Sequence, residues 1–74
     1  MNQKSELLDF VVNYRGKDYQ VQYVASSEFV DVEVAWGEHH QKSTRQLGGM
    51  NPENVARIAA LEILRVANEN DLLE

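Results

Sequence analysis

GGMNPENVARIAALEILRVANEN, residues 48–70, is the stretch that decides the fold of this chain. Asn51 suits the N-cap of a helix, Pro52 suits the first helical position, and Glu53 places a carboxylate at the positive end of the helix dipole. The glycine pair before them favours a tight turn between a strand and the helix. The sequence therefore predicts a helix that begins at Pro52 and continues to about Asn70.

This predicted helix has more apolar side chains than one face can hide. Unrolled at about 100° per residue, most of its apolar residues fall in a stripe that covers roughly half the circumference: Val55, Ala56, Ala59, Ala60, Ile63, Leu64, Val66 and Ala67. The small members of this stripe favour close packing on a sheet. Ile58 and Leu61 fall outside the stripe, so we expect them to face outward.

Three earlier segments, 8–14, 19–25 and 30–36, alternate apolar and polar residues with a period of two, which is the strand signature. Residues 37–40 are predicted to form a turn. Residues 41–47 show almost no alternation and are either a polar edge strand or a loop. The apolar sides of the three strands carry Leu8, Phe10, Val12 and Tyr14, then Tyr19, Val21, Tyr23 and Ala25, then Val30, Val32, Val34 and Trp36.

A hairpin is expected to join the first two strands. Gly16 at the first central position suits a two-residue type II′ turn. That register places Tyr14 opposite Tyr19 and keeps the apolar residues of both strands on one face. It also predicts a cross-strand ion pair between Arg15 and Asp18.

These elements predict an α+β domain that spans residues 1–74: an antiparallel sheet of three to four strands, in the order β-β-β-(β)-α, with one C-terminal helix packed on one face. A chain of 74 residues has a thin core, worth about 3–5 kcal/mol at this size, so association is a common source of added stability. The second sheet face should meet water or a partner and carries Asn13, Gln20, Gln22, Asp31 and Glu33.

Composition excludes several classes of function. The chain has 7 Lys and Arg against 12 Asp and Glu, a net charge of −5, which disfavours binding to nucleic acid or an anionic membrane. It has no cysteine, so disulfides, thiolate nucleophiles and cysteine metal sites are excluded. The first six residues are polar and no apolar run approaches the ~20 residues of a membrane span, so we expect a cytoplasmic protein.

No residue pattern indicates catalysis. His39 and His40 are adjacent, and neighbouring strand residues point to opposite faces, so a shared metal would require a turn that brings them together with Glu38. We favour a solvated turn and expect neither metal nor cofactor. The serines and threonine lie outside any nucleophile elbow, and the turn before the helix lacks a phosphate-loop lysine. The expectation is a non-enzymatic protein.

The helix start resembles the end of double-stranded-RNA-binding domains, which close with a glycine, a small capping residue, lysines and an Ala-Ala pair before the last helical turns. The matching residues are Gly49, Asn51, Ala59, Ala60, Ile63 and Leu64, while the lysine positions hold Pro52, Glu53 and Ala56. The resemblance implies a similar helix-on-sheet fold. It transfers no RNA-binding residue, and the first helix of that family is missing.

Self-association is the leading functional hypothesis, because burying a large apolar side chain is worth about 1.5–3 kcal/mol. The expected homodimer interface consists of Ile58, Leu61, Arg65, Leu72 and Leu73. The alternative is a small acidic inhibitor, of the phage or mobile-element type, that binds a basic nucleic-acid-binding surface through Asp31 and Glu33. A weaker alternative is nucleic-acid binding through Arg15, Lys17, His39, His40, Lys42 and Arg45.

Overall fold

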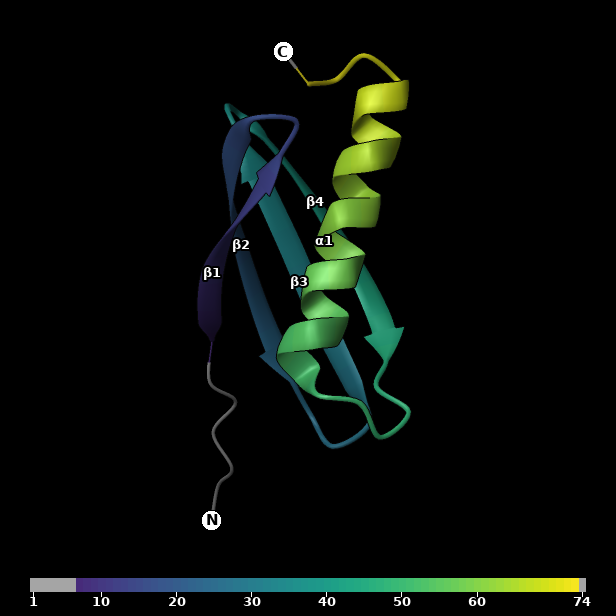
Figure 1. Ribbon diagram of the computed structural model, residues 1–74. Helices are drawn as coiled ribbons and strands as arrows, with labels where there is room; N and C mark the ends of the chain where they lie inside the picture. Colours follow the sequence, from purple (N-terminus) through teal and green to yellow (C-terminus); the bar gives the residue numbers. More distant parts are fainter. Residues whose placement is uncertain (1–6, 74) are drawn as a thin grey trace.

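The computed structural model describes residues 7–73 and has one helix packed across one face of a four-stranded antiparallel sheet (Figure 1). The strands follow one another in the order β1-β2-β3-β4, and the elements are β1 Leu8–Tyr14, β2 Lys17–Ala25, β3 Phe29–Trp36, β4 His39–Gln46 and α1 Pro52–Glu69. The predicted α+β class is confirmed, and residues 41–46 belong to a fourth strand. Residues 1–6, for which the sequence predicts no signal peptide, lie outside the described residues.

The predicted register of the first hairpin is wrong by two residues. Tyr14 pairs with Lys17, and the two central residues of the turn are Arg15 and Gly16, with φ values of 55° and 84°. Two positive φ values are the mark of a type I′ turn, which needs glycine at its second position more than at its first. Asp18 therefore lies opposite Asn13, whose side-chain amide donates to it at 3.0 Å, and not opposite Arg15.

The second hairpin is tighter than predicted. Gly37 and Glu38 alone form its turn, and Trp36 pairs with His39. Only Gly37, at φ 55°, has a positive φ among the two central residues, as in a type II′ turn. His39 and His40 are therefore the first residues of β4 and do not belong to the turn.

Both ends of α1 are capped by side chains or turns. The Asn51 side chain accepts hydrogen bonds from the backbone N–H groups of Glu53 and Asn54, at 2.8 and 3.3 Å, which confirms the predicted N-cap. At the other end Asp71 adopts φ 58°, and the Leu72 N–H donates to the Ala67 carbonyl at 2.8 Å, the six-to-one bond of a Schellman motif. The chain then turns back toward the sheet. Within residues 7–73, no helix has the length and apolarity needed to cross a membrane.

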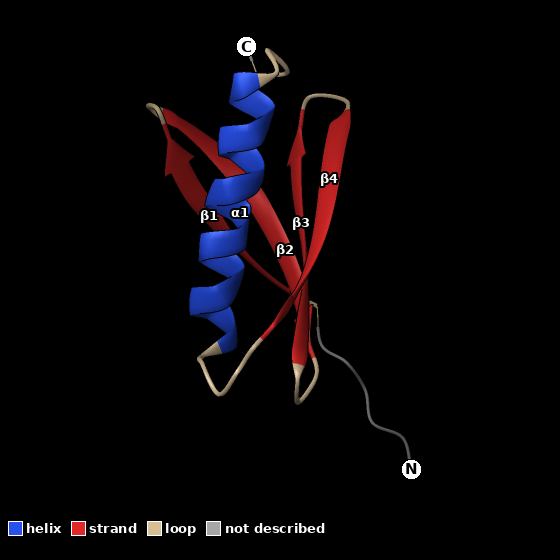
Figure 2. Cartoon of the chain, turned by 90° about the vertical axis from the view of Figure 1, so that its right-hand side faces the viewer, coloured by secondary structure: helices blue, strands red, loops and turns tan. Residues whose placement is uncertain are grey.

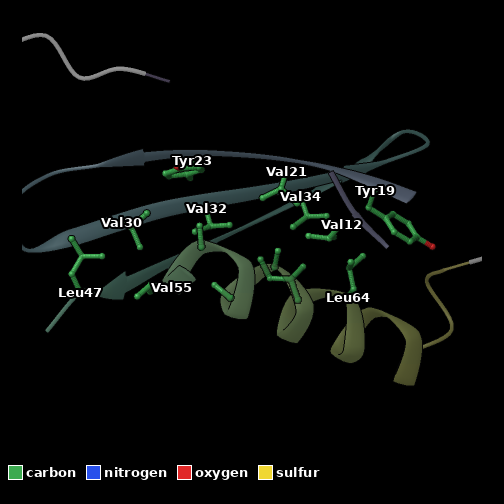
Figure 3. Packing of buried hydrophobic residues seen from close by; sticks show 14 residues of the cluster. Val12, Tyr19, Val21, Tyr23, Val30, Val32, Val34, Leu47, Val55 and Leu64 are labelled. Carbon is green, nitrogen blue, oxygen red and sulfur yellow. The ribbon is translucent and has the colours of Figure 1, made fainter. Parts of the chain in front are cut away.

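The core lies between α1 and the sheet (Figure 3). The strands contribute Val12, Tyr19, Val21, Tyr23, Val30, Val32 and Val34, and the helix contributes Val55, Ala56, Ala59, Ala60, Ile63 and Leu64. The three alanines are 0% exposed, so the helix axis lies close to the strands. Leu47 follows β4, is buried, and donates its N–H to the Glu28 carbonyl at 2.8 Å, which extends the β3–β4 ladder past the last residue of β4.

Candidate functional site

Ile58 and Leu61 lie on the side of α1 that faces away from the sheet. Ile58 is 49% exposed and Leu61 is 37% exposed, whereas Leu64, one turn further, is 0% exposed. With Arg65, exposed on the next turn, they form a line along the helix at spacings of three and four residues, which we name the outer face of α1. The structure therefore brings three of the five predicted interface residues together.

Charged side chains surround Ile58 and Leu61 on the outer face. Arg57 pairs with Glu53 at 3.0 Å and Arg65 pairs with Glu69 at 3.3 Å, both across one helical turn. The Arg57 guanidinium also lies over the Phe10 ring, 4.7 Å from its centroid. An apolar centre with a polar border is the usual anatomy of a protein–protein contact.

Glu62 joins α1 to β4 through Arg45. The Arg45 guanidinium donates a hydrogen bond to the Glu62 carboxylate. This hydrogen bond, with the positive charge of Arg45, lowers the pKa of Glu62 below its usual value. Glu62 therefore keeps a negative charge at the border of the outer face, on the flank opposite to that of Arg57.

Leu72 and Leu73 do not join Ile58 and Leu61. The helix end at Glu69 is about 12 Å along the axis from Leu61, at 1.5 Å per residue. Beyond it the Schellman turn sends Leu73 back against the core, where it is partly buried. Leu72 stays 47% exposed, and its carbonyl accepts a hydrogen bond from the Trp36 indole N–H at 3.2 Å.

A groove of about 410 Å³ separates the second half of α1 from β4. Figure 2 shows the two elements diverging toward the end of the sheet that carries the β3–β4 turn. Val66 lines this groove and is 48% exposed, although its position in the apolar stripe predicts burial. The reason is β4, whose helix-facing residues Gln41, Ser43 and Arg45 are polar and form no apolar floor.

Asp31 and Glu33 lie on the sheet face opposite α1, which we name the free face. Neither carboxylate is isolated. The Thr44 hydroxyl donates to Asp31 at 2.6 Å, and the His40 Nδ1 lies 2.9 Å from a Glu33 carboxylate oxygen. The free face is therefore acidic in its centre and partly compensated along β4.

The β1–β2 and β3–β4 turns lie at the same end of the sheet (Figure 1). A hollow of about 350 Å³ at this end is lined by Lys17, Tyr19, Trp36, His39 and Leu72, among others. His39 and His40 point to opposite faces, as expected for strand neighbours. Within the described part of the chain, no three potential metal-ligating side chains converge.

This chain matches no protein-family model, no curated protein and no solved structure. The resemblance to double-stranded-RNA-binding domains therefore stays a prediction. At its lysine positions Pro52 begins the helix, Glu53 pairs with Arg57, and Ala56 is buried. None of the three side chains can neutralise a phosphate.

Proposed function

We propose that this chain is a small, non-enzymatic protein–protein interaction module of the cytoplasm that forms a homodimer through the outer face of α1. One observation carries the proposal: Ile58 and Leu61 are 49% and 37% exposed, while Ala59, Ala60, Ile63 and Leu64 on the sheet side of the same helix are buried. Isolated exposed aliphatic residues are common on protein surfaces. Two at helical contact spacing, inside a border of charged residues, are the pattern of a helix–helix seam.

The residue types favour a second copy as the occupant. In a parallel pair of helices, Ile58 takes an a position and Leu61 the following d position, and a β-branched residue at a with leucine at d favours two strands. Arg57 then takes the preceding g position and Glu62 the following e position. Each Arg57 would face Glu62 of the second copy, so the two flanks of α1 are complementary in charge.

The expected affinity is low. About half of each apolar side chain remains to be buried, which is worth about 1 kcal/mol per side chain and about 4 kcal/mol for the four in a dimer. Association costs at least a comparable amount in lost freedom. The contacts at the border, Arg57 with Glu62 of the second copy among them, must then supply the net affinity, so we expect a dissociation constant no tighter than about 1 mM. Leu73, which packs on its own core, and Leu72, whose carbonyl accepts from Trp36, are left out of the proposed interface.

Sedimentation equilibrium up to about 1 mM tests the proposal, since a measurable fraction of dimer forms as the concentration approaches the expected dissociation constant. The unaltered chain should dimerise, and the Ile58→Glu, Leu61→Glu chain should stay monomeric. The matched control is Met50→Glu, Val66→Glu, which adds the same two charges at residues 51% and 48% exposed but off the outer face. A monomeric unaltered chain contradicts the homodimer, and a dimer that survives the outer-face changes contradicts the interface.

The free face supports the alternative of a small acidic inhibitor that docks on a basic nucleic-acid-binding surface. Asp9, Asp18, Asp31 and Glu33 share this face across three strands. Binding of such a partner should weaken steeply with salt, and salt-indifferent binding would count against it.

Direct nucleic-acid binding receives less support. Arg15, Lys17 and His39 lie toward the same end of the sheet, but Arg45 lies farther along β4 and is held by Glu62. The remaining positive charge is a small phosphate footprint for a chain of net charge −5.

A further inference from the structure

The two edges of the sheet differ in how they are protected against pairing with another strand. One edge is strand β4, which contains His39, His40, Lys42 and Arg45. Basic side chains of this kind discourage edge-to-edge pairing. In β1, residues Leu8–Tyr14, Asp9 is the one charged residue, and neither proline nor glycine interrupts the strand. The β1 edge is therefore the open one.

The register shows which backbone groups β1 leaves unpaired. Tyr14 and Lys17 close a two-residue hairpin, and such a closing pair exchanges both backbone hydrogen bonds. Hydrogen-bonded and non-hydrogen-bonded pairs then alternate along the antiparallel ladder. The N–H and C=O groups of Asp9, Val11 and Asn13 consequently point away from β2, and within residues 7–73 no strand pairs with them.

Apolar side chains lie beside this edge on both faces of the sheet. Leu7 is 60% exposed, Leu8 is 40% exposed and Val11 is 52% exposed. On the helix side Phe10 is partly buried and covered by the Arg57 guanidinium, 4.7 Å from the ring centroid. A strand that added to β1 would cover these side chains while it satisfied the open backbone groups.

Charge then distinguishes the two sides of the incoming strand. Its side chains on the free-face side would stand about 5 Å from Asp9, on a face that also carries Asp18, Asp31 and Glu33. On the helix side they would meet apolar residues and the positive charge of Arg57. The complementary segment has cations on the first side and apolar residues on the second.

A second copy of β1 complements this edge less well. The antiparallel register that sets Val11 opposite Val11 of the second copy also sets Asp9 opposite Asn13, so the copy brings no cation to Asp9. Each copy also carries a net charge of −5.

We propose that the edge of β1 binds an extended segment of a basic partner protein, in which apolar residues facing Leu8 and Phe10 alternate with lysine or arginine residues facing Asp9. Strand addition of this kind takes its affinity from main-chain hydrogen bonds and its specificity from alternate side chains. This surface shares Arg57 with the border of the outer face of α1 but includes neither Ile58 nor Leu61, so the partner segment and a second copy can bind together.

The test uses a capped eight-residue peptide of alternating valine and lysine, with a peptide of the same composition in two blocks as the control. Hydrogen exchange measured by NMR should slow at least tenfold at the amides of Asp9, Val11 and Asn13 with the alternating peptide and stay unchanged with the block peptide. Equal effects of both peptides would overturn the proposal. So would protection of the outward amides of β4, at Lys42 and Thr44.

Two variants locate the site. Val11→Pro removes an outward N–H, a substitution that edge strands accept, and should lower peptide affinity at least tenfold. Lys42→Pro makes the matched change on β4 and should leave the affinity unchanged; the same loss in both variants would overturn the proposal. Should Val11→Pro fail to fold, Asp9→Lys serves instead, and it should transfer the preference from the valine–lysine peptide to a valine–glutamate peptide.

Two further observations separate this proposal from the homodimer. The Ile58→Glu, Leu61→Glu chain should bind the peptide as the unaltered chain does, so either proposal can fail alone. The second observation is hydrogen exchange at rising protein concentration without peptide. If the outward amides of β1 become protected, a second copy occupies this edge, and the proposal of a basic partner is overturned.

Discussion

The inner and outer faces of α1 carry similar aliphatic residues in different surroundings. On the inner face Leu64 is 0% exposed and Ile63 is 8% exposed, whereas on the outer face Leu61 and Ile58 are 37% and 49% exposed. Only one side of the helix packs on the sheet, where the buried valines and tyrosines of the strands contact it. What buries a leucine in this chain is therefore the presence of a facing strand, and the hydrophobicity of the residue alone does not determine it.

The largest expected effect compares the same substitution on the two faces. Leu64→Ala should lower the free energy of unfolding by about 3 kcal/mol, because it leaves a cavity between α1 and the sheet. Leu61→Ala should cost less than about 1 kcal/mol, since its side chain is already partly in water. Urea denaturation at a protein concentration far below the dimerisation range measures both. Equal losses of stability in the two variants would contradict the distinction between the inner and outer faces of α1.

A smaller effect is expected at the start of the helix, which supports both faces equally. Asn51→Ala should cost about 1 kcal/mol of stability, because the N–H groups of Glu53 and Asn54 lose their acceptor. The control is Asn54→Ala, one turn into the helix, which caps nothing and should be close to neutral. Thermal unfolding of both variants checks the expectation. A neutral Asn51→Ala would mean that packing alone sets where α1 begins.

The smallest effect concerns the flank between the faces. Because Arg45 lowers the pKa of Glu62 in the folded chain below its ordinary value of 4.5, the ionised carboxylate stabilises the fold above that value. This contribution is lost as the pH falls through the lower pKa of the native state. Glu62→Gln should thus reduce stability at neutral pH, and the difference between the two chains should shrink as the pH falls below 4.5. A difference between the two chains that stays constant with pH would contradict the role of the charge.

The sequence was sufficient for the elements with strong local signals. Asn51 and Pro52 begin the helix where their types predict, and the period-two segments become β1, β2 and β3. The hairpin register was wrong because a shift by two residues keeps every side chain on the same face. The apolar pattern therefore cannot distinguish a turn centred on Gly16 and Lys17 from the observed turn of Arg15 and Gly16.

The candidate surfaces were only partly predictable for a related reason. An edge strand that is polar on both faces has no alternation, so β4 could not be separated from a loop. The exposure of Val66 follows from β4, because Gln41 and Ser43 give it no apolar neighbour. The placement of Leu73 depends on the positive φ of Asp71, and no glycine marks that position in the sequence. The unpaired edge of β1 could be recognised only once the order of the strands in the sheet was known.

The most direct test of the proposed helix–helix contact is sedimentation equilibrium of a mixture of two charge variants, Arg57→Glu and Glu62→Arg. Each variant alone should associate more weakly than the unaltered chain, because like charges then face one another across the dimer. Mixed in equal amounts, they restore two opposite-charge contacts, and the dissociation constant should fall about tenfold below that of either variant. A mixture that sediments as the separate variants do would contradict the homodimer through the outer face of α1.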